Sequence, residues 1–68
     1  GVETTPAKVV ANHGEINVIG NANSVEVYNV GGILISKDEF NVKCNAGIYL
    51  VKVDGKVSKV IVRLFNNR

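Results

Sequence analysis

Closely spaced turn signals divide the chain into short segments, and this spacing limits the possible folds more than any other feature. The turn signals lie at residues 12–14, 20–23, 31–32, 37–38, 45–47 and 54–55, and most contain glycine or asparagine, which tolerate the positive φ angles of tight turns. The segments between them are residues 7–11, 15–19, 24–30, 33–36, 40–44, 48–53 and 56–64. None carries apolar residues at helical spacing over the ten or so positions that a helix needs. The pattern therefore predicts seven short strands and no helix.

The composition agrees with an all-β fold. The 68 residues include thirteen valines and six isoleucines but only three leucines, and β-branched side chains favour strands. A hydrophobic share of 46% with 21% charged residues is typical of a globular chain rather than a disordered one. Short strands joined by regular turns predict one small antiparallel β-sandwich or barrel.

The chain has room for a single domain. Because it begins with Gly1 rather than methionine, we expect it to be a piece of a longer protein. We expect residues 1–6, which include Pro6, to be a linker from an upstream domain, residues 7–64 to form the domain, and residues 65–68 to be a tail. No signal peptide opens the sequence, and no apolar run approaches the roughly 20 residues of a membrane span, so we expect no membrane insertion.

Asp54-Gly55 is the strongest local turn signal, because this dipeptide suits a two-residue type I′ hairpin. Such a turn sets Val53 opposite Lys56, and counting back along the strands pairs Val51 with Ser58. Alternation then divides the hairpin into two faces. The predicted core face carries Tyr49, Val51, Val53, Ser58, Val60 and Val62. The other face is a basic surface with an apolar stripe, formed by Ile48, Leu50, Lys52, Val57, Lys59, Ile61 and Arg63.

Two further segments alternate in the same way. In residues 24–30 we expect Val25 and Val27 to face the core and Tyr28 to lie across a sheet edge with its hydroxyl in water. In residues 40–44 we expect an inward row of Phe40, Val42 and Cys44.

The residue types needed for catalysis or metal binding are scarce. His13 lies in a polar turn with no other ligand type clustered near it, and the lone Cys44 is expected to behave as a small buried hydrophobe. The carboxylates are scattered singly, and no helix follows Gly31-Gly32 to make a phosphate site. We therefore expect no enzyme, no cofactor and no metal site.

The charge is unevenly distributed. Residues 1–39 carry two lysines against five acidic residues, or −3, whereas residues 40–68 carry six cations against one carboxylate, or +5. Nucleic-acid binding is not expected, because at least two of the four aromatic residues are assigned to the core and a stacking surface needs exposed ones. Lysines that discourage pairing at a strand edge remain a simpler explanation of the basic end.

Two blocks of sequence carry a family resemblance. Residues 47–53 read Gly-Ile-Tyr-Leu-Val-Lys-Val, and residues 59–63 follow a short turn as Lys-Val-Ile-Val-Arg. Upstream, residues 27–32 read Val-Tyr-Asn, two residues and Gly. Together with Gly1-Val2-Glu3 and residues 14–20, these blocks resemble the type A, or Por, class of C-terminal sorting domains of the type IX secretion system.

The resemblance implies an antiparallel β-sandwich with an immunoglobulin-like Greek-key arrangement. It also implies a non-catalytic signal that directs a larger exported cargo protein of Bacteroidetes from the periplasm to the cell surface or the exterior. The implied partners are the outer-membrane translocon, a sortase-like peptidase and the upstream cargo domain. The implied recognition residues are Lys52, Lys59, Val60, Ile61, Val62 and Arg63, and the implied structural ones are Gly32, Gly47, Tyr49, Val51, Val53, Asp54 and Gly55.

A second hypothesis stays open. The domain would then be an accessory or adhesion module of a secreted protein, binding a glycan or a neighbouring domain through its outer face. Loss of binding on substitution of Tyr28 would favour this second hypothesis.

Overall fold

A computed structural model describes residues 7–64, so the linker predicted for residues 1–6 and the tail predicted for residues 65–68 lie outside the described residues. Within this range the regular structure consists of strands. The strands are β1 (Lys8–Asn12), β2 (Glu15–Ile19), β3 (Val25–Asn29), β4 (Leu34–Lys37), β5 (Asn41–Lys43), β6 (Gly47–Val53) and β7 (Lys56–Val62). Each of the predicted segments overlaps one of them, with ends that differ by at most two residues.

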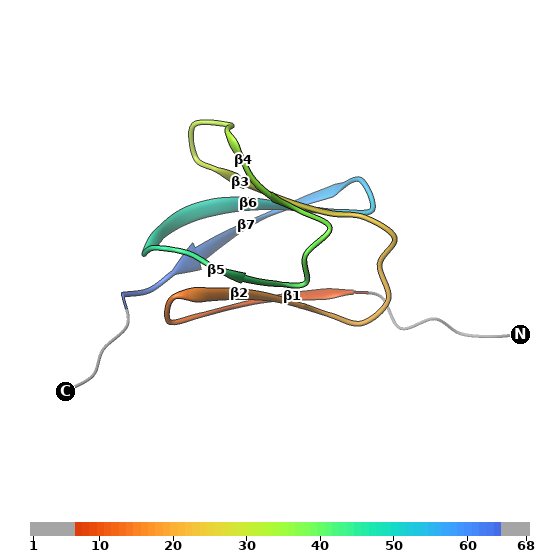
Figure 1. Cartoon of the computed structure of the whole chain (residues 1–68), viewed down its shortest axis with the longest axis horizontal. Coiled ribbons are helices and arrows are strands. Elements are labelled where there is room, and N and C mark those ends of the chain that lie inside the picture. The colour runs from red at the N-terminus through yellow and green to blue at the C-terminus, as the bar shows by residue number, and fades with distance from the viewer. Residues whose placement is uncertain (1–6, 65–68) are drawn as a thin grey trace, which may run out of the picture.

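The strands form two antiparallel sheets that lie one on the other as two layers (Figure 1). One sheet has the order β1-β2-β5 and the other the order β4-β3-β6-β7. The chain passes from one sheet to the other between β2 and β3, between β4 and β5, and between β5 and β6. The predicted all-β antiparallel β-sandwich is thus confirmed, while the immunoglobulin-like Greek-key detail stays a prediction.

The β6–β7 hairpin has the register that the Asp54-Gly55 turn predicts. Val53 pairs with Lys56, Val51 with Ser58 and Tyr49 with Val60. Both turn residues have positive φ angles, 50° at Asp54 and 89° at Gly55, as a type I′ turn requires. The local sequence therefore fixes which residues of the two longest strands share a face.

The core lies between the layers and is formed by alternate residues of five strands. Its buried members are Ile16, Val18, Val25, Val27, Val42, Tyr49, Val51 and Val62. Of the predicted hairpin core, Val53 and Val60 are half-buried and pack against this cluster, and Ser58 is exposed. Ser58 differs from the prediction because it faces a groove between the sheets rather than the closed core.

Two side chains lie elsewhere than the sequence predicts. Phe40 is 37% exposed, because it stands at a bend before β5 and the inward row begins only at Val42. Tyr28 does not lie at a sheet edge, because β3 pairs with β4 on one side and β6 on the other. The residue as a whole is half-buried, and its hydroxyl donates a hydrogen bond of 2.7 Å to the carboxylate of Glu26. Since β3 is an inner strand, the predicted edge position is wrong.

Candidate recognition surface

The outer face of the four-stranded sheet carries part of the recognition set that the family resemblance implies. Its side chains form three rows across paired strands; the two longer rows mix apolar residues with charged or aromatic ones, and the third is apolar throughout. The rows are Leu34–Tyr28–Leu50–Lys59, Lys37–Glu26–Lys52–Val57 and Ile48–Ile61. Most of the apolar members are exposed, with Val57 at 61% and Ile61 at 60%. Exposed apolar groups gathered on one face are typical of interaction surfaces.

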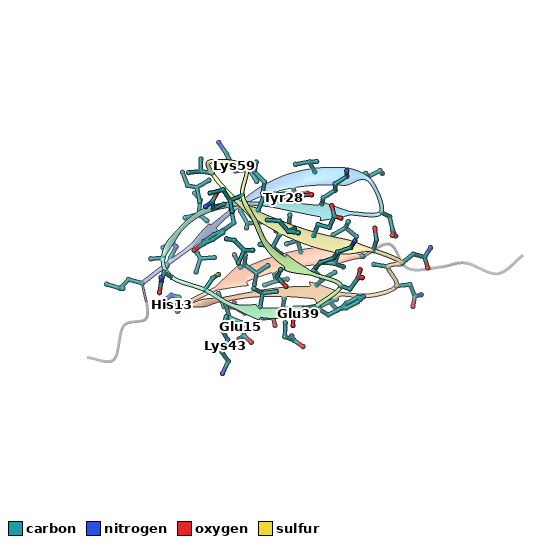
Figure 2. All side chains as sticks on the ribbon, turned by 45° about the horizontal axis from the view of Figure 1, so that its top comes forward. His13, Glu15, Tyr28, Glu39, Lys43 and Lys59 are labelled. Atoms are coloured by element: carbon teal, nitrogen blue, oxygen red, sulfur yellow. The ribbon has the colours of Figure 1, made fainter. Side chains whose placement is uncertain are left out.

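The structure brings together part of the predicted recognition set. Lys52, Lys59 and Ile61 lie on this outer face, and Arg63 follows β7 as an exposed residue. Figure 2 shows Lys59 projecting on the opposite side of the molecule from Glu15 and Lys43, which belong to the other sheet. Val60 and Val62 point inward, and Val62 is only 1% exposed. These two valines contribute to the core rather than to the outer surface.

The hairpin that carries the surface is electropositive. From β6 onward the described residues include Lys52, Lys56, Lys59 and Arg63 against the single carboxylate of Asp54, a balance of 4 − 1 = +3. Such a local excess raises the encounter rate with acidic partners and makes that rate depend on salt.

Asp54 anchors the tip of this hairpin. Its carboxylate accepts hydrogen bonds from the main-chain N–H groups of Asn23 at 2.8 Å and Ser24 at 2.9 Å. Its own N–H donates to the carbonyl of Ser24 at 3.0 Å. The turn residue therefore also fastens the hairpin to the β2–β3 connection, a contact that the sequence pattern did not reveal.

Strand β7 is an edge of its sheet, since it pairs with β6 alone among the described strands. Just beyond β7, the carbonyl of Arg63 accepts a hydrogen bond of 3.1 Å from the N–H of Gly14, in the β1–β2 turn. His13 forms a parallel bridge with Arg63 at the same place. The edge strands β1 and β7 meet along one side of the sandwich, which we call the β1–β7 seam. The seam is closed at this end.

Toward its other end the β1–β7 seam opens into a groove of about 720 Å³. We call it the seam groove. Its apolar lining consists of Ala7, Val9, Ala22, Val53 and Val60, all of them half-buried. Its polar lining consists of Asn21, Asn23, Asp54, Lys56, Ser58 and Lys59. Sequence reasoning missed this groove, because small residues such as Ala7 and Ala22 beside turns carry no signal of their own.

The predicted structural motif residues lie around the hairpin and the β3–β4 loop. Tyr49 is 8% exposed, and its hydroxyl donates a hydrogen bond of 2.7 Å to the carbonyl of Asn45. This contact is of the same kind as the tyrosine corner of sandwich folds, in which the hydroxyl bonds to the backbone upstream. Gly32 has a φ of 88° and its N–H donates to the carbonyl of Asn29 at 2.9 Å, which closes the loop.

Burial perturbs two acidic groups near the start of β6. Desolvation raises the pKa of the Tyr49 phenol above its ordinary value, and the neighbouring Cys44 thiol raises it further. Desolvation also raises the pKa of Cys44, partly offset by a hydrogen bond with Tyr49. A raised pKa keeps the thiol protonated, and the protonated thiol is a poor nucleophile.

The described residues show no other constellation for chemistry. Residues 7–64 hold no group of three or more His, Cys, Asp or Glu residues arranged to bind a metal ion. His13 lies exposed in the β1–β2 turn (Figure 2). The same range also contains no helix long and apolar enough to cross a membrane.

Comparison with protein-family models, with curated proteins and with solved structures finds no match to this chain.

Proposed function

We propose that this domain is a non-catalytic sorting signal that directs a larger exported protein to the type IX translocon and on to the cell surface. The observation that carries the proposal is the outer face of the β6–β7 hairpin. There Lys52 and Lys59 stand among the exposed apolar side chains of Val57 and Ile61. A partner protein can therefore recognise this surface through charge complementarity and apolar contact, without catalysis.

Deletion of residues 59–68 from the parent would be a poor test of this proposal. It would remove Val62, which is 1% exposed and belongs to the core, so a lost signal would be indistinguishable from a lost fold. Substitutions confined to the outer face avoid this problem.

The sharper test reverses charge in the full-length parent protein. Lys52→Glu combined with Lys59→Glu changes the outer face of the four-stranded sheet, and Lys8→Glu combined with Lys43→Glu makes the same change in net charge on the other sheet. The first pair should hold the parent in the periplasm, and the second should leave surface delivery unchanged. Surface protein is measured by protease shaving and fractionation. Normal delivery of the parent with the first pair would contradict the proposal.

The accessory-module hypothesis has one feature in its favour. Tyr28 stands in the middle of the outer face beside Leu34 and Leu50, where an aromatic ring could contact a sugar or a neighbouring domain. Under this hypothesis Tyr28→Ala abolishes binding on a glycan array or in a pull-down with the upstream domain, while export is unaffected.

A further inference from the structure

At the β1–β7 seam, main-chain N–H and C=O groups of β7 point away from β6, toward the open edge of the sheet. The carbonyl of Arg63 points toward the seam, because it accepts the N–H of Gly14. Alternate residues of a strand direct their main-chain groups to the same side. The N–H and C=O groups of Val57, Lys59 and Ile61 therefore also face the open edge, and no partner for them is found among residues 7–64.

The side chains beside this edge divide into two sets. The half-buried apolar residues that line the seam groove face inward, and Val9 and Val60 approach it from opposite sheets. On the outward side Lys59 is flanked along β7 by Val57 and Ile61. A strand added to β7 would place its alternate side chains in these same two environments.

We propose that the seam groove takes up an extended acidic peptide of a partner protein, which adds a strand to the edge of β7. Its apolar side chains cover Val9 and Val60, and an outward carboxylate lies beside Lys59. This inference rests on the proposed function, since the peptide would belong to a protein that recognises the sorting signal.

The charges around the groove select the acidic class of peptide. Lys56 and Lys59 line the groove, and the carboxylate of Asp54 already accepts two main-chain N–H groups. Opposite charges on adjacent strands attract, and like charges repel. A basic peptide would therefore be disfavoured at this edge.

Binding is measured by fluorescence anisotropy with the 68-residue chain and a labelled octapeptide that alternates valine with glutamate. Saturable binding that weakens with added salt is expected. An octapeptide that alternates valine with lysine should bind at least about tenfold more weakly. Equal binding of the two peptides, or no binding at millimolar concentration, would overturn the proposal.

Main-chain pairing has its own test. N-methyl groups on the valines, or on the glutamates, of the same octapeptide block the N–H donors along one of its two edges. One of these two N-methylated peptides should bind and the other should not, because only one edge of the peptide pairs with β7. If both N-methylated peptides bind like the parent peptide, strand addition is wrong.

Hydrogen exchange locates the peptide. Peptide binding should slow amide exchange at Val57, Lys59 and Ile61, whereas Ser58 and Val60 are already paired with β6 and should change little. Protection confined to β1, or to the outer face of the three-stranded sheet, would contradict the assignment.

Matched variants separate this inference from the proposed function. Lys59→Glu should weaken the valine–glutamate octapeptide at least about tenfold, and Lys43→Glu, on β5 of the other sheet, should not. Circular dichroism confirms that both variants fold. If Lys59→Glu blocks export but the octapeptide does not bind, the proposed function stands and the strand-addition site is refuted. If the octapeptide binds as expected while export tolerates Lys52→Glu combined with Lys59→Glu, the site stands and the sorting role is refuted.

Discussion

Replacing Tyr49 with phenylalanine tests how the sandwich is held at the start of β6. The ring is buried, and the change removes only the hydroxyl that donates to the carbonyl of Asn45 at 2.7 Å. Because Asn45 is exposed, its carbonyl can accept a bond from water instead. The weak contact of the hydroxyl with the Cys44 thiol is lost as well. The cost is therefore close to that of one ordinary hydrogen bond, about 1 kcal/mol in the free energy of unfolding.

The same position gives a second, larger perturbation for comparison. Tyr49→Ala removes the ring as well, and a large-to-small core substitution of this kind costs about 3–5 kcal/mol. For a domain of this size a loss of about 1 kcal/mol lowers the melting temperature by roughly 4–8 °C. We therefore expect the melting temperature to fall by several degrees in Tyr49→Phe and by roughly 12–40 °C in Tyr49→Ala.

Both variants are measured by thermal and urea denaturation followed by circular dichroism. The ratio of the two losses is the informative quantity. If Tyr49→Phe were as unstable as Tyr49→Ala, the hydroxyl rather than the ring would supply most of the stabilisation by Tyr49, contrary to this reasoning. A Tyr49→Phe variant as stable as the unsubstituted 68-residue chain would show that the bond to Asn45 contributes nothing to the free energy of unfolding.

Three further predictions concern the hairpin and pH. Asp54→Ala should cost about 1–2 kcal/mol in urea denaturation, because two main-chain N–H groups lose an acceptor and alanine is strained at the φ of 50°. Asp54→Asn keeps an acceptor oxygen and tolerates this φ, so it should recover most of the loss; equal losses would contradict this role. Lys59→Ala should change the free energy of unfolding by less than about 0.5 kcal/mol, and a larger loss would show that the Lys59 side chain stabilises the fold. The free energy of unfolding should fall as the pH rises above about 9. The folded state raises the pKa values of Cys44 and Tyr49 and so holds their protons more tightly than the unfolded chain does. Stability that rises between pH 9 and pH 11 would contradict the signs of these shifts.

The elements that local chemistry determines could be predicted from the sequence. The Asp54-Gly55 turn sets the β6–β7 register, and alternation then assigns Tyr49 and Val51 to the core. Both depend on residues close together in the chain. Alternation failed at Phe40 because that residue precedes β5 at a bend, where a period of two no longer applies.

The arrangement of the sheets could not be predicted in the same way. Strand β3 lies in the middle of its sheet because it pairs with β6, more than twenty residues later, and nothing near Tyr28 signals that pairing. The seam groove depends on the same kind of long-range placement. It lies between β1 and the β6–β7 hairpin, whose separation is set by the packing of two sheets rather than by any local motif.

The position of Val62 has a consequence for a chain that emerges with its amino end first. This buried side chain stands at the end of the last strand that the structure describes, and the hydrogen bond that closes the seam involves the very next residue. The early strands can form only the β1–β2 and β3–β4 hairpins by themselves, because β2 and β3 each also need a late strand, β5 and β6, to complete their sheets. The nascent polypeptide is therefore expected to remain unfolded until β7 has been synthesised, and so to stay thin enough for threading through a narrow channel.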